Sequence, residues 1–298
     1  MAIISTATTA SLQYFRRGVQ APSFLTARGA DFQRLKDEGR DHCSVVIVPD
    51  LVRGGGAPLI FPQERIDDLL IRIDLAHAKG LRVDVKHNPW RDQLKAAYLD
   101  ESWGRFDESL VQICQALNTC DLTRTRLEIL PEPGWLFSLT DPLPHAEGRK
   151  VATAKLESFW RHAVPLCASR SRVTLLLGSA GYGHLVGPGE FQDIKEFHPN
   201  CVNVCRFYWP HPVTHYGKAY PGAPADNVEK YQTGALPWNR DGMRQALMVW
   251  KNLAAPRKHI SESQPLPEYR FTPSGTAWRT DFTELCAELG LSYTFWDF

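Results

Sequence analysis

The sequence predicts an α/β fold of the (β/α)8 type, a TIM barrel, and two observations support this prediction. Short apolar runs alternate with amphipathic helical patterns along the 298 residues. Counting the runs gives eight strand candidates separated by seven helical ones. Strict alternation is typical of a parallel sheet, and eight units favour closure into a barrel over an open sheet.

The strand candidates are short runs rich in Val, Ile, Leu and aromatic residues, several of which end at a turn residue such as Pro49. In chain order they cover residues 14–19, 43–48, 81–85, 126–130, 173–177, 202–207, 258–261 and 291–296. Most are too short for helices, and their apolar character is that of strands buried on both faces.

The helical candidates show apolar residues at the spacing of one helix face, and several end at a glycine. They cover residues 26–36, 64–79, 103–117, 149–170, 191–197, 239–253 and 277–289. Thr26 is the expected N-cap of the first, and Gly39, Gly80 and Gly290 are expected stops. Pro165 predicts a kink in the fourth. The chain stops at Phe298, so the sequence predicts a barrel that lacks the usual eighth outer helix.

The pattern predicts one domain over residues 1–298, since a (β/α)8 barrel commonly needs about 250 residues or more. A doubly wound open sheet is the alternative fold. No Gly-x-Gly-x-x-Gly follows the first strand candidate, so the dinucleotide fingerprint of that fold is absent from the sequence. The Gly178-Ser-Ala-Gly-Tyr-Gly stretch is not a P-loop, because no Gly-Lys-Ser/Thr follows it.

Composition favours a neutral partner. The formal net charge is +1, and no basic run indicates binding to nucleic acid or to an anionic membrane. The N-terminus lacks the basic and apolar regions of a signal peptide, and no segment is apolar enough to span a membrane, so we expect a cytoplasmic location rather than export. The seven cysteines form no Cys-x-x-Cys pair, which predicts reduced, buried thiols.

Glu132 and Glu262 are the candidate catalytic residues. Each follows an apolar run that reads as a strand, the fourth and the seventh respectively. In a (β/α)8 barrel the carboxyl ends of all strands meet at one face, where catalytic residues lie. Two carboxyl groups about 5–5.5 Å apart would serve a retaining glycosidase, with one as proton donor and the other as nucleophile. A solvated loop glutamate is the alternative for either residue.

Further residues at strand ends and in aromatic loops are expected to bind substrate. The apolar face of a sugar stacks well on indole, and polar groups at strand ends lie on the catalytic rim. The expected binding residues are His87, Asn88, Trp90, Trp135, Arg206, Tyr208, Trp209, His215 and Trp296.

No metal or other cofactor is expected. His211 and His215 lie four residues apart, but Pro212 between them argues against the helix that would align them. No Gly-x-Ser-x-Gly is present either, which argues against an esterase of the α/β-hydrolase type.

Six stretches carry a resemblance to a known family in order and spacing. They are Phe15-Arg-Arg-Gly-Val-Gln, Phe32-Gln-Arg-Leu-Lys-Asp-Glu-Gly-Arg-Asp-His, Ala76-His-Ala-Lys-Gly-Leu-Arg-Val-Asp-Val-Lys-His, Leu127-Glu-Ile-Leu-Pro-Glu-Pro, Val213-Thr-His-Tyr-Gly and Tyr293-Thr-Phe-Trp-Asp-Phe. Together they resemble the cellulases of glycoside hydrolase family 5 over nearly the whole chain. The resemblance implies a (β/α)8 barrel of retaining β-glycosidases with the acid/base at Glu132, the nucleophile at Glu262 and an oligo- or polysaccharide as substrate.

The chain departs from the family at positions that bear on chemistry. The family's Arg near the second strand falls on Ser44, its Asn before the acid/base falls on Pro131, and its His after the sixth strand falls on Arg206. The residues after the nucleophile are Ser263-Gln264 instead of the usual Phe-Gly. His87, Tyr208 and Trp296 match.

Two functions follow from these observations. The first is a retaining glycoside hydrolase or transglycosylase acting on a β-linked glucan or related polysaccharide. In it, Tyr208 and Arg206 would keep Glu262 ionised, and that ionised carboxylate, with the flanking Trp135, would raise the pKa of Glu132. The second is a catalytically impaired barrel that binds saccharide without cleaving it, which the three departures favour.

Overall fold

The structure, a computed structural model, describes residues 17–20, 27–51, 59–89, 102–131, 145–178, 198–208, 214, 231–232, 239–252, 258–263 and 272–296. Within these ranges, only the backbone is described at residues 17–20, 50–51, 145–153, 262 and 296.

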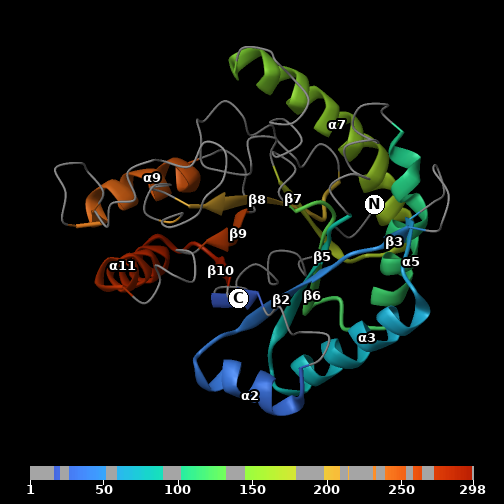
Figure 1. Ribbon diagram of the computed structural model, residues 1–298, viewed down its shortest axis with the longest axis horizontal. Coiled ribbons are helices and arrows are strands. Elements are labelled where there is room, and N and C mark those ends of the chain that lie inside the picture. Colours follow the sequence, from blue (N-terminus) through green and yellow to red (C-terminus); the bar gives the residue numbers. More distant parts are fainter. Residues whose placement is uncertain are drawn as a thin grey trace, which may run out of the picture.

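Eight parallel strands close into a barrel, as the alternation predicts (Figure 1). They are β1 (Arg17–Gln20), β2 (His42–Ile47), β5 (Arg82–His87), β6 (Thr125–Glu128), β7 (Thr174–Gly178), β8 (Cys201–Phe207), β9 (Lys258–Ser263) and β10 (Tyr293–Trp296). Each strand pairs with the next in this order, and β1 also pairs with β10, which closes the ring. All eight sequence candidates overlap these strands, so the (β/α)8 prediction is confirmed.

Helices follow the strands and surround the barrel in Figure 1. They are α2 (Gly29–Asp37), α3 (Gln63–Ala78), α5 (Asp107–Leu117), α7 (His145–Arg170), α9 (Arg240–Asn252) and α11 (Pro273–Leu289), with a 3₁₀ turn η2 (Trp103–Phe106) leading into α5. Gly39, Gly80 and Gly290 have φ values of 75°, 76° and 69°, so the predicted stops occupy the left-handed region that glycine favours. The helix expected at 191–197 lies outside the described residues.

Three local features differ from the sequence prediction. Helix α2 begins at Gly29 rather than after Thr26, because Asp31 accepts a hydrogen bond from the backbone N–H of Arg28 at 2.8 Å and fixes the first turn there. Helix α11 begins at Pro273, where the Thr272 hydroxyl accepts from the Gly275 N–H. A two-stranded hairpin, β3 (Asp50–Leu51) with β4 (Leu59–Ile60), follows β2, and no periodicity predicted it.

The strands present two different faces, because successive side chains alternate. The outward residues pack against the helices. Those of β2, β5, β6 and β7 contact α3, α5 and α7. Most of those of β8, β9 and β10 contact α9 and α11. The lumen side has a small apolar cluster, Leu176, Val202 and Val204, and beside it a set of fully buried charged and polar side chains. This polar lumen lies beneath the carboxyl ends of the strands.

Two further sequence expectations concern thiols and membranes. Six of the seven cysteines are buried, as predicted, and Cys120 is half-buried. Among the described helices, none combines the length and the apolar character that a bilayer crossing requires.

Candidate active site

The two candidate glutamates belong to the fourth and seventh strands of the barrel, β6 and β9. Strand β6 ends at Glu128, and Glu132 follows four residues later, outside the described residues. Glu262 lies within β9, one residue before its end. Both positions therefore belong to the carboxyl ends of parallel strands, the end at which (β/α)8 enzymes build their active sites.

Strand β9 contains a β-bulge at Ser261 and Glu262. Against β8, Ile260 pairs with Cys205 and Glu262 with Arg206, so β9 advances two residues while β8 advances one. Against β10, the register also shifts, between Tyr293 and Phe295. The extra residue changes the pairing partners of everything that follows, and bulges are frequent beside active sites because they re-aim a side chain.

The bulge places position 262 in register with a lumen residue. Paired residues of neighbouring strands share a face of the sheet, and Arg206 belongs to the lumen, where it contacts Glu128. If the same residues formed a regular ladder without a bulge, Ser261 would pair with Arg206 and Glu262 with Phe207. Phe207 packs outward against Phe282 of α11.

An upper layer of buried charges lies across the lumen at this level. Arg206 Nη2 donates to Glu128 Oε1 at 2.9 Å, and both side chains are fully buried. Lys86 Nζ lies 3.8 Å from Glu128 Oε2 and donates to the Ser261 carbonyl at 3.1 Å. The Ser261 hydroxyl completes the layer at 3.4 Å from Glu128 Oε1. Among the described side chains of this layer, two cations thus share one carboxylate.

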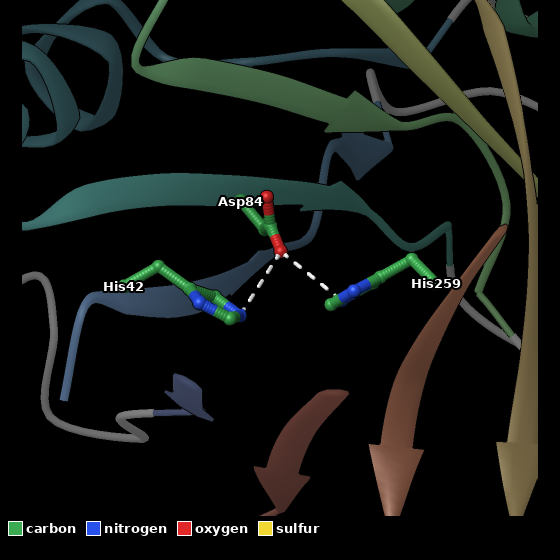
Figure 2. Close-up of side chains that lie close together, drawn as sticks. All are labelled: His42, Asp84 and His259. Atoms are coloured by element: carbon green, nitrogen blue, oxygen red, sulfur yellow. Dashed lines mark ion pairs between the residues drawn. The ribbon is translucent and has the colours of Figure 1, made fainter. Parts of the chain in front are cut away.

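A lower layer, nearer the amino ends of the strands, is built around Asp84. Arg126 donates two hydrogen bonds of 2.6 Å to its two oxygens. The imidazoles of His42 and His259 approach the same carboxylate at 3.8 and 3.7 Å, as Figure 2 shows. The Thr294 hydroxyl lies 2.8 Å from His42 Nε2 and 3.0 Å from His259 Nε2. Burial and the neighbouring Arg126 cation lower the pKa of His259 well below its usual value, so this imidazole is neutral.

The lower layer has some geometry of a metal site. One ligand atom from each of His42, Asp84 and His259 lies within 4.8 Å of the others. The Nδ1 atoms of the two histidines contact Asp41 and Ser292, an arrangement typical of the partners that orient metal ligands. The imidazole nitrogens therefore face one carboxylate from two sides.

A metal ion nevertheless does not fit this cluster. Arg126 Nη2 lies 2.6 Å from the Asp84 oxygen that faces both histidines and 3.2 Å from His259 Nε2. A metal ion would lie beside this fully buried guanidinium, where like charges repel strongly. The Thr294 hydroxyl already bridges the two imidazoles. The cluster is a closed hydrogen-bonded network.

His87, an expected binding residue, is the last residue of β5 and is 1 % exposed. Its Nδ1 contacts the Ile129 carbonyl at 3.0 Å, and its Nε2 contacts the Ser109 hydroxyl of α5 at 2.9 Å. Burial lowers its pKa to about 4, so the ring is neutral, with Nδ1–H donating and Nε2 accepting. His87 thereby holds the segment that connects β6 to Glu132.

Three other predicted residues are partly or fully described. Asn88 is half-buried directly after β5, and its backbone N–H donates to the Ile47 carbonyl at 2.9 Å. Tyr208 follows β8, is 4 % exposed and accepts the Thr214 hydroxyl on its carbonyl at 2.7 Å. Arg206 belongs to the upper layer. Trp90, Trp135, Trp209 and His215, together with the side chains of Glu262 and Trp296, lie outside the described residues.

Three positions that depart from the family pattern are buried. Ser44 and Arg206 are 0 % exposed, and Pro131 is buried just before Glu132. Ser44 is the register partner of Asp84, so it belongs to the polar lumen. In this barrel the lumen cation beside position 262 comes from β8, through Arg206.

The sequence reasoning missed most of the lumen network. The signal for it is visible in the strands Arg-Val-Asp-Val-Lys-His and Thr-Arg-Leu-Glu, where opposite charges alternate with apolar residues. In a strand of a closed parallel barrel both faces are buried, so such charges have to pair across the lumen. The missed residues are His42, Asp84, Lys86, Arg126, Glu128, His259, Ser261 and Thr294.

Comparison with known proteins finds similarity in structure. No protein-family model matches the sequence. A search of curated protein sequences finds no match either. Among solved structures, Thermotoga maritima Cel5A in complex with cellobiose has a TM-score of 0.76 at 16 % identity over 97 % of this chain and 92 % of its own.

Two further structures are similar over most of the chain. The GH5-4 broad-specificity endoglucanase from Clostridium longisporum has a TM-score of 0.71 at 13 % identity over 98 % of this chain and 88 % of its own. The cellulose synthase subunit Z of Clostridioides difficile has a TM-score of 0.67 at 16 % identity over 95 % of this chain and 92 % of its own. The chain therefore has the (β/α)8 fold of these proteins, in agreement with the resemblance that its six motifs carry.

Proposed function

We propose that the chain is a divergent member of glycoside hydrolase family 5 that hydrolyses a β-linked glucan or a related polysaccharide with retention of configuration. The observation that carries this proposal is the bulge in β9, which puts Glu262 in register with the lumen residue Arg206 at the carboxyl end of the seventh strand. Glu132 follows the fourth strand at the same end. The similar structures include Thermotoga maritima Cel5A in complex with cellobiose and in complex with mannotriose.

The charges of the upper layer support Glu262 as the nucleophile. Lys86 and Arg206 place two cations beside Glu128 in this buried layer, and buried positive charge favours the ionised form of a neighbouring carboxyl. A nucleophile must be ionised before it attacks the anomeric carbon. Glu132 then acts as the proton donor to the departing oxygen and, after the glycosyl-enzyme forms, activates the water that hydrolyses it.

A saccharide-binding barrel without turnover is the second candidate. The observation that favours it is the replacement of three family positions by the buried residues Ser44, Pro131 and Arg206. Proline has no N–H and no polar side chain, so Pro131 cannot supply the hydrogen bond to the sugar that the family's Asn provides. Retention of both glutamates favours the enzyme.

The test uses aryl β-glycosides and β-linked oligosaccharides with the wild type, Glu262→Ala and Glu132→Ala. Loss of the nucleophile should remove turnover of every substrate, and added azide should restore turnover of an activated aryl glycoside. Glu132→Ala should still form the glycosyl-enzyme from an aryl glycoside whose leaving group needs no protonation, seen as a burst of released phenol, but should hydrolyse that intermediate slowly and lose turnover on oligosaccharides. A 2-deoxy-2-fluoro glycoside should label the peptide that contains Glu262.

Glu128→Gln is the matched control, because it changes a third glutamate of the same lumen whose partners are all protein groups. It should not abolish labelling at Glu262. Wild-type-like turnover by Glu262→Ala would refute the nucleophile assignment. Saccharide binding by the wild type with no turnover of any substrate would select the second candidate.

A further inference from the structure

The bulge in β9 is held from the opposite side of the barrel. The extra residue of a bulge is left out of the regular ladder of hydrogen bonds, so its polar groups need other partners. Ser261 finds them in the lumen: its carbonyl accepts from Lys86 Nζ at 3.1 Å, and its hydroxyl lies 3.4 Å from Glu128 Oε1. Both partners are fully buried and come from β5 and β6.

These contacts fix the peptide that joins Ser261 to Glu262. The Ser261 carbonyl belongs to that peptide group, and peptide groups are planar, so a hydrogen bond on the oxygen also sets the orientation of the next N–H. Lys86 is itself held, since its ammonium lies 3.8 Å from Glu128, which Arg206 binds in turn. The orientation of the peptide therefore depends on a buried chain of charges with little freedom to move.

We propose that Lys86 is a positioning residue for the nucleophile: by clamping the bulge at Ser261 it sets the backbone from which Glu262 projects. This proposal rests on the proposed function, in which Glu262 attacks the sugar. Lys86 acts through the Ser261 peptide and requires no contact with substrate. A misplacement of about 1 Å in such a site can cost about 100-fold in rate, so the clamp has a measurable kinetic effect.

The decisive variant is Lys86→Met, which keeps an unbranched side chain as far as the ε carbon and removes the donor and the charge. In this variant Glu128 keeps its ion pair with Arg206 at 2.9 Å, so its buried carboxylate stays paired. We therefore expect the variant to fold. We expect a fall of about 10- to 100-fold in kcat with little change in KM. The acid limb of the kcat/KM profile should move to higher pH, because the cation that favours ionised Glu262 is gone.

Lys258→Met is the matched control. Lys258 opens the same strand, and its ammonium also donates to a backbone carbonyl, that of Lys251, at 2.7 Å. It lies at the amino end of β9, away from the bulge. This variant should keep the wild-type kcat and pH profile. Lys86→Arg retains a donor and a charge, so it should recover part of the turnover and the position of the acid limb.

Hydrogen exchange gives a readout that does not depend on activity. Amide exchange in the peptide that spans 258–263 should become faster in Lys86→Met and stay unchanged at the bulge in Lys258→Met. Wild-type kcat and wild-type exchange in Lys86→Met would overturn the proposal. If that variant fails to fold, Lys86→Gln replaces it, since its shorter amide cannot reach across the lumen, and the same outcomes decide.

Failure of the two proposals can be told apart. If Glu262→Ala keeps full turnover, the proposed function fails, while the exchange measurement still tests the clamp. If Glu262→Ala is inactive and Lys86→Met behaves as wild type in kinetics and in exchange, the proposed function stands and the clamp is refuted.

Discussion

Arg206 and Glu128 form an ion pair of 2.9 Å in the barrel lumen, and neither side chain is accessible to solvent. The pair joins β8 to β6 across the interior. Because Arg206 is also the register partner of Glu262, the same guanidinium takes part in the stability of the barrel and in the electrostatics of the candidate active site.

Arg206→Met should destabilise the protein by about 3 kcal/mol or more, since removal of one partner leaves a buried carboxylate with only the more distant Lys86. Urea denaturation at neutral pH measures the change in the free energy of unfolding. Arg206→Met combined with Glu128→Gln should recover part of the loss, because the carboxylate that Arg206 paired is then neutral and Lys86 keeps its hydrogen bond to the Ser261 carbonyl. A double variant that is less stable than the single one would contradict this account.

Metal ions should have no effect on the lower layer. We expect the melting temperature to be the same after treatment with a chelator and after addition of zinc, because Arg126 and Thr294 fill the space around the ligand atoms of Asp84. Arg126→Met removes the competing cation and provides the comparison. A rise in the melting temperature of the wild type with zinc would show that the closed network opens to a metal.

His87 should make the stability depend on pH. In the unfolded chain its imidazole binds a proton near pH 6.5, but in the folded protein only near 4. Between these values the unfolded state binds more protons, so stability falls as the pH drops from 6.5 to 4 and is fully present above 6.5. The contribution amounts to about 3 kcal/mol.

The check is urea denaturation of the wild type and His87→Gln between pH 4 and pH 7. The difference in free energy of unfolding between them should be largest at pH 7 and shrink toward pH 4. Ser169→Ala, at an exposed position of α7 that carries no titratable group, is the control and should give a difference that does not change with pH. A constant difference across the range for His87→Gln would refute the linkage.

Pro165 lies inside α7 and is exposed, so Pro165→Ala should stabilise the protein by about 1 kcal/mol. Alanine restores the N–H that proline lacks, and the clash of the proline ring with the preceding turn disappears. These gains outweigh the opposing effect that proline lowers the conformational entropy of the unfolded chain. Thermal unfolding measures the change. Ser169→Ala, at another exposed position of α7, should change the stability by less than about 0.5 kcal/mol.

The barrel could be predicted from sequence because each strand is a compact apolar run next to a turn residue, as in the segment that ends at Pro49. The hairpin β3–β4 could not, because strands of two residues carry no periodicity. The lumen charges were missed for a different reason. Asp84 and Lys86 look like the polar face of a strand, and only closure of the barrel turns that face into an interior.

The candidate site was predictable in part. Strand ends pointed to Glu132 and Glu262, and the order of the motifs supported them. The bulge had no signal, because one inserted residue changes neither composition nor hydropathy, and its place depends on the register of β8 and β10. His87 was expected to face substrate because it ends its strand. The sequence could not show that Ser109 of α5 contacts the His87 ring, because that contact depends on how the helix packs on the barrel.

The bulge also makes the structure of β9 depend on the number of residues in this strand. Deletion of Ser261 would leave Glu262 paired with Arg206 and Ser263 with Phe207 in a regular ladder, but it would remove the bulge and both of its lumen contacts, to Lys86 and to Glu128. Substitutions in this stretch alter one contact at a time, whereas this deletion removes the bulge as a whole. Homologues of this chain are therefore expected to vary in residue type here far more readily than in spacing.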